Sequence, residues 1–121
     1  MSVVPVEALR RAMQGDIDAV DDAFTDDVVF VDTTSGDEFD GIDEVREVWA
    51  EMAGRRGIAE VEVMDTTDDT AALHFVIRFR ADAHQYAQRG AADVHLDGGR
   101  IRRWRSAWTE VEEDLTAWGD D

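Results

Sequence analysis

The chain has 121 residues, which is enough for one domain (residues 1–121) and too few for two ordinary ones. Hydrophobic residues make up 44% of it, so it can build a core, and the lack of cysteine excludes disulfides and thiolate metal sites. Its 29 acidic residues outnumber its 12 basic residues, all of which are arginine, and the net charge is −17. Such a surface repels phosphate backbones and anionic lipids, so we expect no nucleic acid and no membrane as partner.

The excess of aspartate over basic residues also bears on the chain's origin. An acidic, lysine-free composition is typical of proteins from salt-accumulating halophiles, because molar salt screens the repulsion between like charges. The N-terminal segment lacks the basic and long apolar regions of a signal peptide, and no apolar run approaches a membrane span. We therefore expect an acidic, halophilic, cytoplasmic protein; the alternative is an ordinary acidic protein of a mesophile.

The first part of the chain predicts two helices followed by a strand hairpin. Apolar residues recur at helical spacing after Pro5, and Gly15 ends this helix. A second short apolar stripe covers residues 17–24. The β-branched and aromatic run from Val28 to Asp32 predicts a strand, which a polar turn connects to a short return strand around residues 38–39.

Gly41 opens a third predicted helix, and the pattern alternates after it. The buried stripe of this helix consists of Ile42, Val45, Val48, Trp49 and Met52. Alternation then predicts strands over residues 58–66, 71–80, 92–97 and 100–109. We expect residues 82–88 to form a loop, Asp97–Gly99 to form a hairpin turn and residues 110–118 to form a short terminal helix. Helices followed by a run of strands predict an α+β fold.

Several segments together resemble the nuclear transport factor two-like superfamily. They are Gln14–Val20 with Phe24–Phe30, then Gly41–Arg46, and finally Asp97–Ile101, which is similar to the family's last hairpin. The resemblance covers nearly the whole chain and is greatest to the SnoaL-like and ketosteroid isomerase-like branch. It implies a cone-shaped, curved antiparallel (mixed) sheet that wraps around three N-terminal helices and encloses an apolar pocket.

The resemblance places a general-base aspartate at the end of the first long strand, where this chain has Asp32. A carboxylate among apolar walls is desolvated, which favours the protonated form and allows it to shuttle a proton near neutral pH. Asp32 shares the inward phase of its strand with Val28 and Phe30. The alternative is that Asp32 only caps the turn at the end of the strand.

The chain departs from the isomerases of this branch at the groups that hold the developing enolate. The position of their tyrosine corresponds to Ala8, and that of their second aspartate corresponds to Ala92, or to Asp93 if the following turn is two residues shorter. Without such donors enolisation loses its largest electrostatic contribution. We therefore do not expect steroid isomerase activity.

Aromatic and aliphatic side chains are predicted to line the pocket. The alternative for each of them is ordinary core packing. The candidates are Phe30, Trp49, Met52, Phe75, Ile77, Phe79, Trp104 and Trp108. Tyr86, in the expected loop, and Arg102, which shares the phase of the tryptophans, are candidates for its mouth. The histidine spacings match no ligand motif, so we expect neither a metal nor another cofactor.

Two functions remain open from the sequence. The first is an uncharacterised SnoaL-like protein that binds a small apolar ligand, with Asp32 as the base of an isomerase or cyclase acting on a keto compound. The alternative is a non-catalytic ligand-binding or dimeric scaffold domain.

The outer sheet face is the predicted homodimer surface. The outward phase of its strands brings apolar residues together with both signs of charge. This face is predicted to carry His74, Val76, Arg78, Asp93, His95, Ile101, Arg103 and Arg105.

Overall fold

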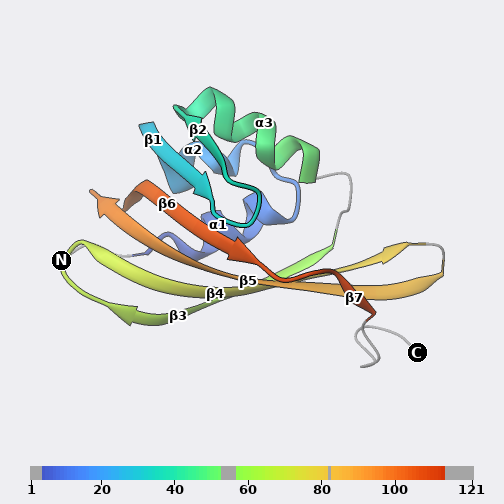
Figure 1. The fold of residues 1–121 in the computed structure, drawn as a ribbon. Helices are drawn as coiled ribbons and strands as arrows, with labels where there is room; N and C mark the ends of the chain where they lie inside the picture. The colour runs from blue at the N-terminus through green and yellow to red at the C-terminus, as the bar shows by residue number, and fades with distance from the viewer. Residues whose placement is uncertain (1–3, 53–56, 82, 114–121) are drawn as a thin grey trace.

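The computed structural model describes residues 4–52, 57–81 and 83–113. Within this part, three helices pack on one face of a curved, seven-stranded sheet (Figure 1). The helices are α1 (Val6–Met13), α2 (Ala19–Ala23) and α3 (Ile42–Met52). The strands are β1 (Phe24–Asp32), β2 (Asp37–Asp40), β3 (Ile58–Thr66), β4 (Thr70–Ala81), β5 (His84–Asp97), β6 (Arg100–Trp108) and β7 (Glu112–Glu113). The predicted α+β architecture with a curved mixed sheet is confirmed.

The strands follow the order β2-β1-β6-β5-β4-β3, and β7 pairs with β5. All neighbours are antiparallel except β1 and β6, which run parallel and bring Asp32 opposite Ser106. The long strands β4 and β5 extend beyond the helices at one end (Figure 1). Because β1 and β6 are paired, the last residues of β1 lie beside the last part of β6.

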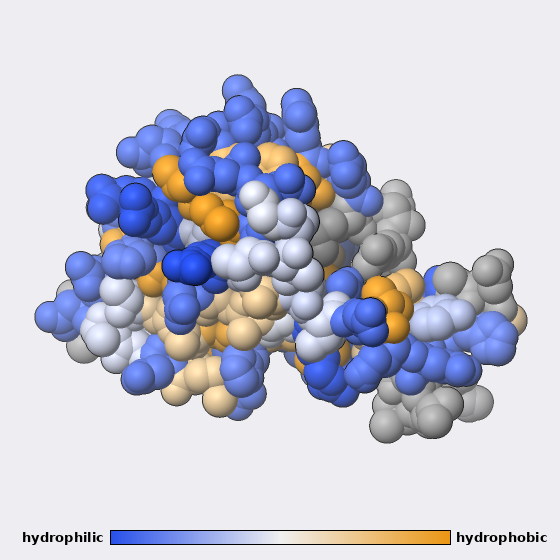
Figure 2. Space-filling model, viewed as in Figure 1, coloured by the Kyte–Doolittle hydropathy of each residue, from blue (hydrophilic) through white to orange (hydrophobic). Residues whose placement is uncertain are grey.

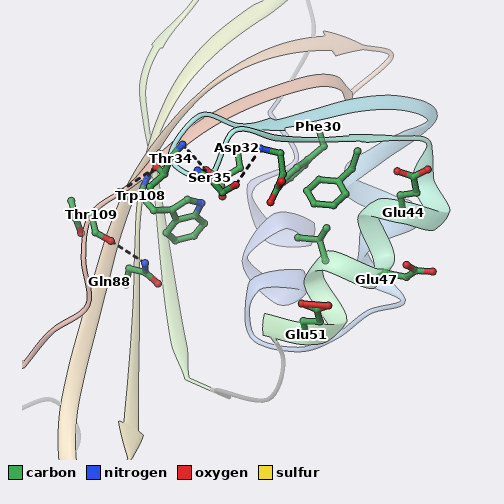
Figure 3. Close-up of a pocket in the computed structure, with 13 residues that line it drawn as sticks. Phe30, Asp32, Thr34, Ser35, Glu44, Glu47, Glu51, Gln88, Trp108 and Thr109 are labelled. Atoms are coloured by element: carbon green, nitrogen blue, oxygen red, sulfur yellow. Dashed lines mark hydrogen bonds between the residues drawn. The ribbon is translucent and has the colours of Figure 1, made fainter.

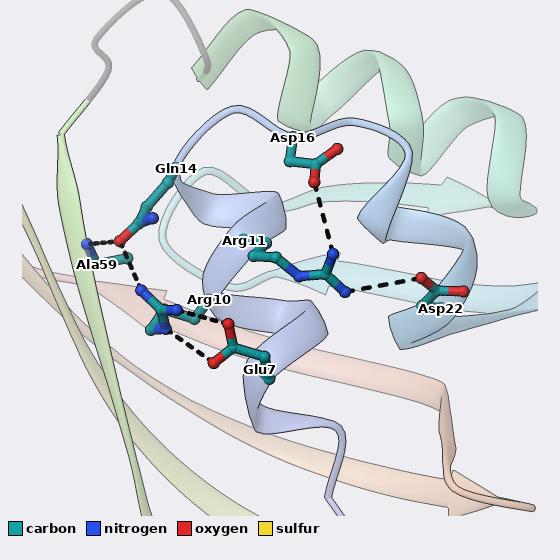
Figure 4. Close-up of polar contacts among 7 residues, drawn as sticks. All are labelled: Glu7, Arg10, Arg11, Gln14, Asp16, Asp22 and Ala59. Carbon is teal, nitrogen blue, oxygen red and sulfur yellow. Dashed lines mark hydrogen bonds and ion pairs between the residues drawn. The ribbon is translucent and has the colours of Figure 1, made fainter.

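The first helix follows the expected pattern. Leu9 and Met13 are buried on one side of α1, and Gly15, at φ 107°, takes the left-handed conformation that ends the helix. The side chain of Gln14 then fixes α1 to β3, because its Oε1 accepts hydrogen bonds from the Ala59 N–H at 2.9 Å and from Arg10 at 3.3 Å (Figure 4).

The core lies between the helices and the inner face of the sheet. Its centre is aromatic: Phe30 stacks on Trp104 with ring centroids 5.3 Å apart, and Trp49 meets both rings edge to face at 6.0 Å. Trp49 and Trp104 are completely or almost completely buried. The outer surface is largely hydrophilic on the side that Figure 2 shows, with apolar side chains in small separate groups.

Three local predictions were wrong. Residues 84–88 do not form a loop; they belong to β5 because they pair with the end of β4, where Tyr86 stacks on Phe79 at 5.7 Å. Glu112 and Glu113 form strand β7 beside β5 instead of a helix, and residues 114–118 lie outside the described part. Ile101 is fully buried in the core because an irregularity between His95 and Leu96 shifts the register of β6.

Candidate functional site

A pocket of about 660 Å³ opens between α3 and the ends of β1 and β6 (Figure 3). Its volume falls in the range of sites that hold a small organic molecule. The lining residues are Phe30, Asp32, Thr34, Ser35, Asp37, Phe39, Glu44, Glu47, Val48, Glu51, Gln88, Trp108 and Thr109. The wall is thus partly aromatic and strongly acidic, instead of apolar throughout.

Asp32 lies half-buried on this wall, where β1 ends. Its Oδ1 accepts hydrogen bonds from the backbone N–H of Thr34 at 2.9 Å and from that of Ser35 at 3.4 Å. Within the described part of the chain, Oδ2 makes no hydrogen bond. The carboxylate is therefore held in place through one oxygen while the other remains available to a ligand.

The turn after Asp32 is fixed to β6. The N–H and the hydroxyl of Thr33 both donate to the carbonyl of Ser106 at 2.8 Å, and the N–H of Trp108 donates to Thr34 Oγ1 at 2.8 Å. The indole of Trp108 packs against Phe75 at 4.7 Å. These contacts set the position of Asp32 relative to the indole on the same side of the pocket.

The opposite wall is one side of α3. Glu44, Glu47 and Glu51 follow one another along this helix, across the pocket from Trp108 and Thr109 in Figure 3. Val45 and Trp49, on the buried side of the same helix, anchor it to the core. The spacing of the three glutamates, i, i+3 and i+7, places them on one side of a helix and is the sequence signal that could have predicted this wall.

The structure brings only some of the predicted pocket residues together. Asp32, Phe30 and Trp108 line the pocket. The other predicted residues whose side chains are described are buried in the core and are absent from the lining: Trp49, Phe75, Ile77, Phe79 and Trp104. The side chain of Met52 lies outside the described part. Tyr86 and Arg102 are also absent from the lining.

The structure shows where the two positions lie at which the chain departs from the isomerase pattern. Ala8 is buried in α1. Ala92 is buried on the inner face of β5, whereas Asp93 is exposed on the outer face opposite Arg105. Ala92 on β5 pairs with Ser106 on β6, and Ser106 pairs in turn with Asp32 on β1. The three residues therefore form one row across neighbouring strands.

Ser106 was not among the site residues predicted from the sequence, but its hydroxyl is a polar group in the same row as Asp32. The residue is 1% exposed, and its Oγ has no hydrogen-bond partner among the described residues. The described residues also contain no group of three or more histidines or carboxylates placed to hold a metal ion.

Comparison with known proteins identifies the family. The model of the SnoaL-like domain matches residues 6–104, which is most of the chain. The chain belongs to the SnoaL-like family. Among curated proteins no sequence matches it.

Solved structures support the same fold for this SnoaL-like chain. A LEH-like epoxide hydrolase from M. tuberculosis is 23% identical, with a TM-score of 0.64 over 86% of this chain and 79% of that one. The epoxide hydrolase/cyclase-like enzyme SalBIII of salinomycin pyran ring formation is 18% identical, with a TM-score of 0.71 over 88% of each chain. A protein with the ketosteroid isomerase-like fold from Catenulispora acidiphila, in complex with trimethylamine, is 17% identical; its TM-score is 0.68 over 88% of this chain and 85% of that one.

Proposed function

We propose that this SnoaL-like protein binds a small organic molecule in the α3 pocket and that Asp32 acts there as a general base on a keto compound. The observation that carries the proposal is the geometry of Asp32. Its carboxylate lies on the wall of a ligand-sized pocket, two backbone N–H groups hold Oδ1, and Oδ2 has no hydrogen-bond partner in the described part. A base must be fixed in this way and still have a free oxygen.

The proposed step moves one proton and leaves the composition of the substrate unchanged. Oδ2 of Asp32 removes a proton from the carbon next to the carbonyl, and the electron pair of that C–H bond moves to the carbonyl oxygen through the enolate. Where a carbon–carbon double bond adjoins that carbon, the protonated Asp32 then returns the proton to the far carbon of the double bond. The carbonyl re-forms, the double bond shifts into conjugation with it, and the compound is isomerised. The aromatic wall formed by Phe30 and Trp108 would hold the apolar body of the substrate.

Two structural neighbours support acid–base chemistry on such a fold. They are named as an epoxide hydrolase and as an epoxide hydrolase/cyclase-like enzyme. Opening an epoxide or closing an ether ring also requires positioned groups that exchange protons with oxygen or carbon.

Deuterium exchange tests the proposed function. Small ketones such as cyclohexanone and 2-tetralone are incubated with the protein in D₂O, and NMR measures the loss of protons next to the carbonyl. We expect exchange above the buffer rate, and Asp32→Asn to lower it by about 100-fold, which is typical of a lost general base.

Asp37→Asn is the matched control, because it removes another carboxylate from the same wall. If the two variants lose activity equally, Asp32 has no special role. If the wild-type protein exchanges none of the ketones above the buffer rate, acid–base action on this class of compound is excluded.

The alternative, a non-catalytic binding domain, is favoured by one observation. The hydrogen bonds from the N–H groups of Thr34 and Ser35 to Asp32 are those of a residue that caps a turn. In that case Asp32→Asn would weaken the turn and leave ligand binding in the pocket intact.

We also propose a homodimer through the outer sheet face. On this face Asp93 lies opposite Arg105 on the neighbouring strand, which brings opposite charges together. Glu62 lies opposite His74 in the same way. Exposed Ile58 lies on the same face as Arg78 and adds apolar surface, in the place of the buried Ile101.

No helix in the described part is long and apolar enough to cross a membrane. The cytoplasmic location expected from the sequence stays a prediction.

A further inference from the structure

Three polar groups in the core have no hydrogen-bond partner among the described residues. They are the indole N–H groups of Trp49 and Trp104 and the hydroxyl of Ser106, and each of these residues is at most 1% exposed. A buried donor without an acceptor is unfavourable, and a native structure contains few of them. Proteins keep such unfavourable groups mainly at functional sites, so these three donors call for a ligand.

The donors lie directly behind the wall of the α3 pocket. On β6, Trp104 pairs with Phe30 of β1, and Ser106 pairs with Asp32 of the same strand. Phe30 and Asp32 both line the pocket, whereas the three donors are absent from the lining. Trp49 reaches the same wall from α3, since its ring meets that of Phe30 at 6.0 Å. One layer of side chains therefore separates the donors from the pocket.

Phe30 is the side chain of this layer that covers the indoles. Its ring stacks on Trp104 with centroids 5.3 Å apart, meets Trp49 edge to face and also lines the pocket. The ring therefore has open space next to it into which it can turn. Phe75 differs in this respect, because it is held between Trp104 and Trp108. A turn of Phe30 is the shortest way to connect the pocket with the buried donors.

The position of Ser106 suits a donor to the molecule on which Asp32 is proposed to act. Neighbouring strands lie about 4.8 Å apart, and paired residues project from the same face of the sheet. In a keto compound a single carbon atom separates the carbonyl oxygen from the carbon that loses its proton. A base on one strand and a donor on the next can therefore act on the two ends of this group. The hydroxyl also supplies a donor to the carbonyl oxygen that the chain lacks at Ala8 and Ala92.

We propose that Ser106 and Trp104 form a buried subsite for the carbonyl oxygen of the ligand. The inference rests on the proposed function in taking a keto compound as the ligand and Asp32 as its base. Phe30 turns toward the pocket when the ligand enters, and the carbonyl oxygen accepts hydrogen bonds from the hydroxyl and the indole N–H. The apolar body of the ligand stays in the pocket. The subsite thereby selects molecules with a neutral acceptor oxygen over hydrocarbons of the same shape.

Binding of 2-tetralone and of 1,2,3,4-tetrahydronaphthalene tests the proposal. The two probes share one bicyclic skeleton, and the second lacks the carbonyl oxygen. The hydrocarbon is the more hydrophobic probe, so a pocket without donors binds it more tightly. Dissociation constants are measured by NMR from the amide shifts of Ser35 and Thr109, which line the pocket. We expect the ketone to bind at least about tenfold more tightly, because it provides an acceptor for buried donors that otherwise have none.

The indole N–H resonance of Trp104 reports the hydrogen bond itself. We expect 2-tetralone to shift this resonance downfield and the hydrocarbon, which has the same aromatic ring, to leave it in place. Trp104→Phe assigns the resonance. Hydrocarbon binding as tight as that of the ketone, or binding of neither probe, would overturn the proposal. So would ketone binding without a shift at Trp104, which is the result expected if an internal water molecule holds the donors permanently.

Ser106→Ala tests the hydroxyl. We expect it to weaken binding of 2-tetralone by about fivefold or more and to leave the affinity for the hydrocarbon unchanged. The hydrocarbon is the matched control probe, because it needs the cavity and no donor. Thr66→Val is the control variant: it removes an exposed hydroxyl from β3, outside the pocket lining, and should change neither affinity. An equal loss for both probes in Ser106→Ala, or no loss for the ketone, would refute the role of Ser106.

The outcome separates this inference from the proposed function. Binding requires no proton transfer, so Asp32→Asn should retain the preference for the ketone. Selective binding of 2-tetralone without deuterium exchange would retain the subsite and remove the catalytic role of Asp32. Deuterium exchange without a preference for the ketone would retain Asp32 as the base and overturn the subsite.

Discussion

Ser106 places a buried hydroxyl in the same row of the sheet as Asp32. Its Oγ and the indole nitrogens of Trp49 and Trp104 are buried and have no hydrogen-bond partner among the described residues. Buried donors without partners are unfavourable, and a native structure contains few of them. Both indoles contact Phe30, which lines the pocket.

Removal of the Ser106 hydroxyl should therefore not destabilise the fold. We expect Ser106→Ala to leave the free energy of unfolding unchanged or to raise it by up to about 1 kcal/mol, since an unsatisfied polar group is lost. Urea unfolding, with Ser35→Ala as the exposed control, measures the change. A loss of more than about 2 kcal/mol would show that the hydroxyl makes a stabilising hydrogen bond.

At the level of single residues, the sequence predicted the site in part. Strand phase and the family resemblance indicated Asp32 and Phe30, because the end of a short, strongly apolar strand is a recognisable local feature. The sequence could not distinguish Trp108, which lines the pocket, from Trp104, which stacks inside the core, because both share one strand phase. That difference depends on tertiary packing, because Trp104 contacts Trp49 of α3 whereas Trp108 lines the pocket.

Among the elements, those with strong local periodicity were predicted well. The strand over residues 58–66 has the predicted limits, and the three helices lie where apolar stripes indicated them. Residues 84–88 were missed because their polar sequence has little strand preference, and pairing with β4 decides their conformation. The register shift in β6 likewise follows from its two neighbours and not from its own alternation.

At Gly90 the backbone of β5 passes close to the core aromatic residue Phe75. A Cβ at this position would lie 2.3 Å from Phe75 Cε2 and 3.1 Å from the carbonyl oxygen of Ala107. Because Phe75 is held between Trp104 and Trp108, its ring has little space to move.

We expect Gly90→Ala to lower the free energy of unfolding by about 1–3 kcal/mol through overpacking. Chemical denaturation measures the loss. Ala91→Ser, at the neighbouring exposed position, serves as control and should change stability by less than about 0.5 kcal/mol. Wild-type stability of Gly90→Ala would mean that the sheet and the Phe75 ring are less tightly packed than described.

For the whole molecule, a net charge of −17 should make stability depend on salt. Repulsion between the carboxylates destabilises the compact state at low ionic strength, and molar KCl reduces the Debye length to about 3 Å. We expect the thermal midpoint, followed by circular dichroism, to rise steadily from low salt to molar KCl. A flat or falling midpoint would argue against adaptation to high salt.

The proposed homodimer gives a second prediction at this scale. Arg103→Glu with Arg105→Glu places negative charges on the outer sheet face, next to Asp93, and should shift the dimer toward monomer. Sedimentation in molar KCl measures the mass, and Arg11→Glu with Arg46→Glu gives the same change of charge on the helices. A monomeric wild-type protein at micromolar concentration in that salt would rule out the dimer.

Each function proposed for this protein requires that ligands bind in the pocket between α3 and the ends of β1 and β6. NMR mapping of backbone amides during a titration with 2-tetralone tests it directly, because further hollows lie on the outer sheet face around Ala91, Asp93 and Ala107. We expect the amides of Ser35 and Thr109 to shift with saturation while those of the outer face do not. Saturable shifts confined to the outer face would contradict it.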